Sequence, residues 1–477
     1  MPARRSRLTS RDGLLADALS ALRRDLAVPD GFPDAAVADA EAAARTVPVE
    51  PGPDLADLRE IPFLTIDPAG ATDLDQAVHL ERHPGGAVLH YAIADVPAFV
   101  GPDTALDHAA RERGQTLYAP DGRVPLHPEL LSEDAASLLP GRDRRAFVWR
   151  FELDARAEPV TTTLTRAVVR SRAQWSYVDA QAAIDAGTAE PTLAAMAWFG
   201  RTRAEREVER GGANLNLPDI RIEPHGDGYR LELDEGVPLE EWNAQVSLLT
   251  GMAAAAIMLD GGVGILRTMP PAAPDDIADF RAQTVTLGLP WRDDVPYGVY
   301  LQSLDGGPLA RVVKEHAAAL FRGAGYTTFD GAPPDQTLQA AIGAPYAHTT
   351  APLRRLVDRW TLVICEALVN GRPVPEWART SLASIPELME RSNRQARQFD
   401  SGARDRVEAA LLHPREGEIF EALVLSVRGD DADVLLHDPP VETRVAGLTA
   451  AAGATVRLRL EHASIGEGTV QCTAVAP

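Results

Sequence analysis

Apolar side chains in the first fifty residues recur at helical spacing. Those of the first segment fall on one face of a helix: Leu14, Leu15, Ala18, Leu19, Leu22 and Leu26. Pro29, Gly31 and Pro33 interrupt this pattern, and a second, alanine-rich segment then runs to about Arg45. The pattern predicts a short helical domain over residues 1–50, which either forms a helix-turn-helix-like clamp or packs against the rest of the chain.

In the central part of the chain, strand-like segments alternate with long apolar helices. Val88–Ala94 and Ala146–Leu153 have the length and the apolar character of strands. Leu248–Leu266 contains Asp260 and four glycines, so we expect a buried alanine-rich helix followed by a turn rather than a membrane span. This mixture predicts one large α+β domain, assigned to residues 51–404.

The last part of the chain, residues 405–477, changes to short segments separated by turns. Four of them alternate like strands: Ile419–Val427, Asp433–His437, Ala454–Glu461 and Thr469–Val475. Four or five strands within about 70 residues are typical of a small β-barrel such as an OB-fold, a common module for binding single-stranded nucleic acid. The expected fold class is therefore α+β, with a large central domain, a C-terminal OB-fold β-barrel and a short N-terminal helical domain.

Composition and charge narrow the class of protein. With 477 residues, 45% of them hydrophobic, the chain can bury a sizeable core. A net charge of −22 and a pI near 4.9 argue against a polyanion as partner, although local patches rather than net charge decide binding. Lys314 is the only lysine. Nearly all positive charge is therefore carried by arginine, whose planar fork suits phosphate.

The cysteines and the N-terminus bear on the compartment. Cys365 and Cys472 lie far apart, which gives neither a disulfide framework nor a zinc-ligand spacing. The N-terminus is basic but leads into no apolar segment, so we expect no secretory signal. These features predict a cytoplasmic protein that does not use a membrane, and we expect a monomer without a protein partner.

The most informative stretch, Thr65–Ala77, reads TIDPAGATDLDQA. It places Asp67, Asp73 and Asp75 within nine residues, directly after the strand-like segment Phe63–Ile66. Like charges this close are costly unless they are neutralised, and Mg²⁺ takes oxygen ligands while leaving positions for water and phosphate. Taken alone, such a motif is more often an acidic surface turn, and it lacks the glycine and glutamate of an EF-hand loop. Its context therefore has to decide whether it holds magnesium.

A second motif, YAHTTAPLRRLVDRW, predicts a helix that begins at Pro352, where a missing N–H costs nothing. The apolar positions after this proline form one stripe: Leu353, Leu356, Val357, Trp360, Ile364, Ala367 and Leu368. Gly371 is the expected stop. Arg354 and Arg355 would then lie in the first turn beside free N–H groups, which predicts an anion site. The alternative is a solvated basic face with Asp358 as ion partner.

Together with these two motifs, three further segments resemble the ribonuclease II and ribonuclease R family of processive 3′-to-5′ exoribonucleases. They are YAIADVPAFV at Tyr91–Val100, LYAPDGRVPLHPELLSEDAASLLPGRDRRA at Leu117–Ala146, and SRAQWSY at Ser171–Tyr177. All five segments stand in the family's order and cover roughly residues 60–400. The expected barrel also stands where the family carries an OB-fold RNA-binding domain.

The resemblance implies a metal site at the scissile phosphate that holds Mg²⁺, or Mn²⁺ as an alternative. Its ligands would be Asp67, Asp73, Asp75 and, more weakly, Gln76. Asp75 would be the carboxylate whose loss abolishes cleavage and spares binding, with Asp73 also catalytic, and Arg354 would neutralise charge on the phosphate.

The resemblance also implies contacts to single-stranded RNA. Tyr118 would stack on nucleotides near the 3′ end and Tyr177 would line the site, although either tyrosine alone is more often a core residue. Base stacking on an aromatic ring contributes roughly 1–3 kcal/mol per base and tolerates any sequence. Arg355 is expected to be structural or to clamp the RNA backbone, and His348 to shape the loop beside it and to be among the residues that contact RNA.

The match fails at three places. Gln76 stands where the family has a fourth aspartate, so we expect an active enzyme with a higher metal requirement or a preference for manganese. Asn243 and Gln245 stand on the helix where the family often has paired glutamates, and they either contact the nucleotide or are buried. The first 50 residues cannot hold the cold-shock barrels that usually precede the catalytic domain.

The expected function is a metal-dependent, hydrolytic 3′-to-5′ exoribonuclease that degrades single-stranded RNA to nucleoside 5′-monophosphates. One alternative is an RNA-binding protein of the same fold whose site is attenuated or inactive at Gln76. A second alternative is a metal-dependent phosphohydrolase for a small phosphoester, which would need neither the barrel nor the tyrosines.

Overall fold

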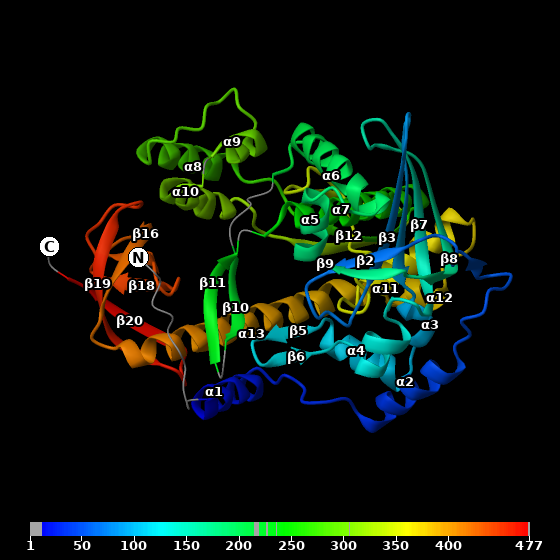
Figure 1. The fold of residues 1–477 in the computed structure, drawn as a ribbon, viewed down its shortest axis with the longest axis horizontal. Coiled ribbons are helices and arrows are strands. Elements are labelled where there is room, and N and C mark those ends of the chain that lie inside the picture. Colours follow the sequence, from blue (N-terminus) through cyan, green and yellow to red (C-terminus); the bar gives the residue numbers. More distant parts are fainter. Residues whose placement is uncertain (1–11, 214–218, 226–227, 235, 305, 476–477) are drawn as a thin grey trace.

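The computed structural model describes residues 12–475, apart from 214–218, 226–227, 235 and 305. Its central element is a seven-stranded sheet in the order β1-β8-β7-β4-β3-β2-β9 (Figure 1). The strands are β1 (Ala56–Asp57), β2 (Leu64–Asp67), β3 (Gln76–His83), β4 (Gly86–Ala94), β7 (Asp143–Asp154), β8 (Pro159–Arg170) and β9 (Ala173–Ser176). The two expected strands pair with each other as β4 and β7. The sheet is antiparallel except at its edges, where β1 runs parallel to β8 and β9 parallel to β2.

Both faces of this sheet are buried, because successive residues of its central strands point to opposite sides. In β4, Tyr91 and Ile93 belong to one hydrophobic core, whereas Ala92 and Ala94 belong to another. The first core includes α6 (Pro191–Glu209), α7 (Pro238–Gly261) and α11 (Asp358–Val369). The second includes α2 (Asp34–Thr46), α3 (Val96–Phe99) and α4 (Ala105–Arg113). Helices on both faces thus hold the sheet and the loops at its ends in place.

The helix α7 is the alanine-rich helix expected from the sequence. It ends at Gly261, Gly262 takes a left-handed conformation, and β12 (Val263–Thr268) follows. Among the described residues it is the one helix long and apolar enough to cross a membrane. Its buried side chains, including Trp242 and Met258, lie in the first core, and this packing accounts for its apolar composition.

The helix expected to begin at Pro352 begins instead at Asp358, as α11. The backbone of the preceding residues is bonded to a distant segment: Thr116 N–H donates to Arg354 O at 3.0 Å, and Leu356 N–H donates to Gly114 O at 3.0 Å. Because these tertiary bonds replace helical ones, residues 352–357 form turns. The expected stop is confirmed, since α11 ends at Val369 and Gly371 has a positive φ of 63°.

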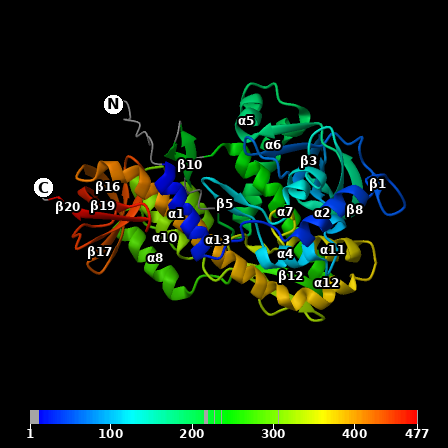
Figure 2. The ribbon, with the colours of Figure 1, turned by 90° about the horizontal axis from the view of Figure 1, so that it is seen from below.

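The two expected N-terminal helices are present and pack on different parts of the chain. The helix α1 (Asp12–Asp25) lies along α13 (Ile385–Leu412), and α2 packs on α4 (Figures 1 and 2). The first contact is sealed where Gln395 Nε2 donates to Leu26 O at 2.9 Å. The structure therefore shows the packing alternative for both helices.

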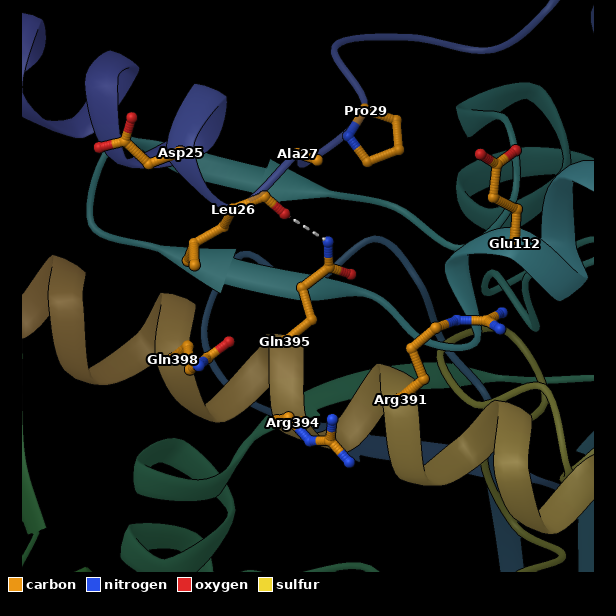
Figure 3. Close-up of a pocket in the computed structure, with 9 residues that line it drawn as sticks. All are labelled: Asp25, Leu26, Ala27, Pro29, Glu112, Arg391, Arg394, Gln395 and Gln398. Carbon is orange, nitrogen blue, oxygen red and sulfur yellow. Dashed lines mark hydrogen bonds between the residues drawn. The ribbon is translucent and has the colours of Figure 1, made fainter.

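A pocket of about 440 Å³ opens between the end of α1, the loop after it, α4 and α13 (Figure 3). Its lining residues are Asp25, Leu26, Ala27, Pro29, Glu112, Arg391, Arg394, Gln395 and Gln398. None of the residues predicted for the metal or RNA site lines this pocket.

The long helix α13 joins the central sheet region to the C-terminal strands, and residues 404–405, the expected domain boundary, lie within it. Five strands form the last sheet in the order β18-β17-β16-β19-β20. They are β16 (Ile419–Arg428), β17 (Asp431–Leu436), β18 (Glu442–Ala446), β19 (Thr455–Ser464) and β20 (Thr469–Ala474). The edge strands β18 and β20 meet, and Thr443 Oγ1 donates to Val470 O at 3.1 Å. This nearly closed barrel confirms the expected OB-fold, with β18 as the strand that the sequence pattern had left open.

Smaller elements complete the structure. Four hairpins or short pairs are β5 (Leu117–Ala119) with β6 (Gly122–Val124), β10 (Asp219–His225) with β11 (Gly228–Asp234), β12 with β13 (Gly325–Asp330), and β14 (Leu338–Gln339) with β15 (Ala344–Pro345). The remaining α-helices are α5 (Tyr177–Asp185), α8 (Pro274–Thr286), α9 (Tyr297–Ser303), α10 (Pro308–Ala318) and α12 (Glu376–Ser381). The β5–β6 hairpin packs against α13 and faces the acidic loop, so it is the part of this group that shapes the site.

Candidate functional site

The acidic loop connects β2 to β3, and its backbone is fixed from both sides. Asp67 is the last residue of β2, as expected for a strand end. Leu74 N–H donates to Ser137 Oγ at 3.0 Å, and Leu138 N–H donates to Leu74 O at 3.0 Å. Ala94 N–H donates to the carbonyl of Asp75 at 2.9 Å. The loop is therefore held in one conformation by neighbouring segments of the chain.

Two of the three carboxylates are deeply buried. Asp75 is 2% exposed and its Oδ1 accepts from Leu353 N–H at 2.7 Å, while Arg354 Nε lies 3.7 Å from its Oδ2. Burial raises the pKa of Asp75 well above its usual range, against the opposing effect of Arg354. Asp67 is 8% exposed, and its Oδ2 is buried without a hydrogen-bond partner. Burial raises the pKa of Asp67 to about 6 against the opposing effects of the nearby Thr65 hydroxyl and of Arg354, and the charge of Asp73 adds to the rise.

The third carboxylate, Asp73, is held by an arginine from the β5–β6 hairpin. Arg123 Nη1 donates to Asp73 Oδ1 at 2.7 Å. Its Nη2 donates to Thr72 Oγ1 at 2.8 Å and forms an ion pair with Glu133. Asp73 also raises the pKa of Asp75, so it lies close enough to both Asp67 and Asp75 to repel each of them.

Gln76, the first residue of β3, uses its amide nitrogen for a structural contact. Its Nε2 donates to the carbonyl of Thr350 at 2.5 Å, which ties the acidic loop to the segment before α11. An aspartate here would have no donor for that carbonyl. The amide oxygen of Gln76, the atom that could meet a cation, is not used in this contact. The role of Gln76 as a weak metal ligand stays a prediction.

The two arginines predicted for an anion site lie in turns before α11, not in the first turn of a helix, so that part of the expectation is wrong. Arg354 is half exposed and extends along the site, with its guanidinium closest to Asp75. Arg355 instead donates from Nε and Nη2 to both oxygens of Asp358, each at 3.0 Å. The structure therefore separates them: Arg354 is free to meet a phosphate, and Arg355 is used within the protein.

His348 is likewise engaged within the protein. Its Nδ1 meets the hydroxyl of Tyr326 at 2.7 Å, and its ring packs edge-on against Tyr346. Burial lowers the pKa of His348 well below its ordinary value, so the ring is neutral near pH 7. A contact of His348 with RNA remains a prediction, and its contacts are those of a residue that shapes the loop.

The two tyrosines lie in different settings. Tyr118 on β5 is 50% exposed, which makes it one of the few exposed large apolar side chains in the described part of the chain. Tyr177 is the first residue of α5, and its hydroxyl accepts from Asn243 Nδ2 at 3.1 Å. Tyr118 thus has a half-exposed ring near Asp73 and Asp75, whereas Tyr177 is partly buried near Asp67, and the contacts of both with RNA stay predictions.

The two amides on α7 point in different directions. Asn243 is partly buried and donates to the hydroxyl of Tyr177. Gln245 is buried and its Nε2 donates to Glu207 at 2.7 Å, between α6 and α7. Of the two alternatives for these amides, contact with the nucleotide or burial, burial holds for Gln245. Asn243 is not fully buried.

The donor chemistry of the loop fits a hard divalent cation. Within the described residues, no three His, Cys, Asp or Glu side chains converge closely enough to hold a metal as they stand. The loop nevertheless supplies only oxygen ligands, and Asp67 Oδ2 is a buried acceptor with no partner. A buried carboxylate oxygen of this kind is costly unless a cation or a donor meets it.

The sequence reasoning missed Arg123 and Glu133, although both stand within a quoted motif. The signal was available: Pro120, Asp121 and Gly122 mark a tight turn, which sets the residues on either side of it opposite each other. Tyr118 and Arg123 are such a pair, and the structure has them as direct partners across the hairpin.

Comparison with known proteins gives the same picture. The RNB domain matches residues 55–371, and the RNase II-type exonuclease C-terminal S1 domain matches residues 418–475. The chain is 26% identical over 361 residues to exosome complex exonuclease RRP44 homolog A of Arabidopsis thaliana, covering 71% of this chain but only 38% of that protein.

Solved structures share the fold. The apo form of Mycoplasma genitalium RNase R superposes with a TM-score of 0.88 at 17% identity, over 97% of this chain and 78% of that one. Yeast Ssd1, described as a pseudonuclease, superposes with a TM-score of 0.72 at 17% identity, over 93% of this chain and 57% of that one. With two thirds of its length matched by the RNB domain, and the expected resemblance confirmed, the chain belongs to the RNB family and carries an RNase II-type S1 domain at its C-terminal end.

Proposed function

We propose that this protein is a metal-dependent, hydrolytic 3′-to-5′ exoribonuclease that degrades single-stranded RNA to nucleoside 5′-monophosphates. The observation that carries the proposal is the buried Oδ2 of Asp67, which has no hydrogen-bond partner and lies at the end of β2, close enough to Asp73 for its charge to raise the pKa of Asp67. A carboxylate cluster of this kind stabilises a fold poorly. It is suited to holding a cation at a phosphate.

Asp67, Asp73 and Asp75 would hold one or two Mg²⁺ ions, with Mn²⁺ as a substitute. Such ions, when bound, supply a nucleophilic water and stabilise the departing 3′ oxygen. The protein's part is to hold the three carboxylates in fixed positions. Arg354 favours the charged form of both Asp67 and Asp75, because its guanidinium lies beside them.

Arg354 would bind the scissile phosphate. Its side chain is 47% exposed and its nearest acidic oxygen, Asp75 Oδ2, is 3.7 Å away, longer than a charge-assisted hydrogen bond. The guanidinium therefore keeps donors available for a phosphate oxygen. There it would offset the negative charge that develops as the P–O bond breaks.

Tyr118 and Tyr177 would hold the 3′-terminal nucleotides. The exposed ring of Tyr118 offers a stacking surface that every base can use, which suits an enzyme acting on any sequence. Tyr177, fixed by Asn243, would form the opposite wall. Direct contacts of Arg355 or His348 with RNA would require these side chains to leave Asp358 and Tyr326.

The test is cleavage of a 5′-labelled single-stranded RNA of about 30 nucleotides, with magnesium, with EDTA, and with the Asp75→Asn variant. Collapse of the ladder to a short 5′-labelled remnant, only with metal and only with Asp75, supports the proposal and fixes the direction. Chromatography of the released product identifies the nucleoside 5′-monophosphate. An RNA that is bound but stays intact in high manganese contradicts it.

One structural observation favours a second candidate, an RNA-binding protein with an inactive site. Gln76 donates to Thr350 where the family has an acidic residue, and a protein described as a pseudonuclease shares the fold. The same labelled RNA distinguishes the two candidates. The third candidate, a small-molecule phosphohydrolase, is tested by competition with a mononucleotide phosphate. Such an enzyme would accept this competitor, whereas an RNA enzyme would not.

A further inference from the structure

Arg123 lies at the centre of a closed hydrogen-bond network that ends on the acidic loop. It donates to Asp73 Oδ1 at 2.7 Å and to Thr72 Oγ1 at 2.8 Å, and it pairs with Glu133. Thr72 Oγ1 in turn donates to Glu133 Oε2 at 2.8 Å. The side chains of Arg123, Asp73 and Glu133 are 24%, 14% and 23% exposed, so the bond from Arg123 to Asp73 is partly shielded from water, whereas Thr72 is exposed.

The network leaves one oxygen of Asp73 unused. Arg123 takes Oδ1, and in the described structure no hydrogen bond or ion pair engages Oδ2 of this residue. Arg123 itself has no freedom to swing away, because its second amino group is held by Thr72 and Glu133. The orientation of the Asp73 carboxylate is therefore fixed, while its Oδ2 stays available to a ligand.

The same hairpin carries the exposed tyrosine. Tyr118 on β5 and Arg123 on β6 are direct partners in the antiparallel register, and side chains of such partners lie on the same face of a hairpin. One face of the hairpin thus presents an aromatic ring to the site and an arginine to Asp73. The position of the hairpin therefore determines where the Tyr118 ring and the Arg123 guanidinium lie.

We propose that Arg123 is a positioning residue for the metal site: it orients Asp73 through Oδ1 so that Oδ2 faces the cation, and it couples this carboxylate to the hairpin that carries Tyr118. The inference rests on the proposed function for the presence of a cation. Partners that orient a metal-binding carboxylate in this way contribute about 10–100-fold to metal affinity. Arg123 touches neither the metal nor the reacting phosphate.

The test compares Arg123→Met with a matched control, Arg23→Met. Arg23 on α1 holds the turn of the same hairpin, since its Nη1 and Nη2 donate to both oxygens of Asp121 at 2.9 and 2.6 Å. The control therefore removes an arginine–carboxylate pair at the turn of the same hairpin and leaves the bonds of Arg123 to Asp73 and Thr72 in place. Both variants keep an unbranched, largely apolar side chain and lose the guanidinium donors.

Two readouts are needed, and the first does not depend on cleavage. Mn²⁺ binding is followed by the loss of the free-ion EPR signal in the absence of RNA. RNA affinity is measured in EDTA by fluorescence anisotropy. Arg123→Met is expected to weaken Mn²⁺ binding about 10–100-fold and to leave RNA affinity in EDTA unchanged. Arg23→Met is expected to leave Mn²⁺ binding unchanged, and Arg123→Lys, which keeps one donor and the charge, to restore part of the affinity.

Unchanged or tighter Mn²⁺ binding in Arg123→Met overturns the inference, because it would make the arginine a bystander or a competitor of the cation. If that variant does not fold, Glu133→Gln removes the anchor of Arg123 instead and must weaken Mn²⁺ binding in the same direction. A wild-type protein that binds Mn²⁺ but leaves RNA intact would contradict the proposed function and leave this inference standing. If the wild-type protein cleaves RNA and Arg123→Met binds Mn²⁺ as tightly as the wild type, this inference is contradicted and the proposed function stands.

Discussion

The central region and the C-terminal barrel use charge in opposite ways. Residues 418–475 are all described, and none of their charged side chains is buried. The central region buries several, among them Asp67, Asp75, Asp107 and Arg359. The barrel is thus stabilised by apolar packing with charges at its surface, as small soluble domains commonly are. The central region keeps costly buried charges, and under the proposed function those of the acidic loop serve the metal site.

The largest expected effect is at Asp75. Asp75→Asn should abolish RNA cleavage while the melting temperature stays the same or rises, because the substitution removes a buried charge and keeps an acceptor for Leu353 N–H. Gel assays and differential scanning fluorimetry on the same preparation check both parts. A clear fall in melting temperature would show that this buried carboxylate serves the fold, and would break the comparison.

The buried ion pair between Arg359 and Asp107 should instead be structural. Its atoms meet at 2.8 Å with both side chains fully buried. Arg359→Met leaves Asp107 poorly compensated and should cost about 3–5 kcal/mol of stability. The matched change in the barrel, Arg444→Met, breaks an exposed pair with Asp433 at 2.9 Å and should cost about 0–1 kcal/mol. Urea unfolding measures both, and equal losses would remove the distinction between the two regions.

A single added charge at position 76 tests how the loop balances repulsion and metal binding. Gln76→Asp brings a carboxylate to the loop and should lower the metal concentration for half-maximal cleavage by about tenfold or more, since one unit charge near a cation is worth roughly 1–4 kcal/mol. The loss of the bond to Thr350 works against this gain. Gln76→Glu, which keeps the side-chain length, serves as the companion variant. An unchanged metal requirement in both variants would contradict the prediction that the lack of a carboxylate at position 76 weakens metal binding.

The smallest effect is expected at Glu408, where α13 meets the barrel. Glu408 is 5% exposed, and burial raises its pKa from 4.5 to about 8, with Asp405 adding to the effect. Between these two values the unfolded chain releases a proton that the folded protein retains, so stability should fall as pH rises through this window. Glu408→Gln should flatten that dependence and raise the melting temperature by a few degrees at pH 8. Parallel thermal melts at pH 5.5 and pH 8 decide it, since an equal shift at both would contradict the assignment.

Much of the local structure follows from the sequence because it depends on short-range patterns. Several elements correspond to segments whose apolar periodicity fits either a helix or a strand but not both. They are the strand before the acidic loop, the paired strands β4 and β7, the alanine-rich α7 and the strands of the barrel. The positions of Asp67 at a strand end and of Gly371 after a helix follow from the same local rules.

The tertiary structure decided what local rules could not. Residues 352–357 have a helical pattern but form turns, because Gly114 and Thr116 take their backbone hydrogen bonds. Arg123 meets Asp73 across 50 residues and Gln76 meets Thr350 across 274. The sequence by itself determined which residues could hold a cation and a nucleotide. Which of them are free and which are already engaged depended on partners brought together only by the fold, since a hydrogen bond needs its two atoms within about 3 Å and no periodicity records that distance.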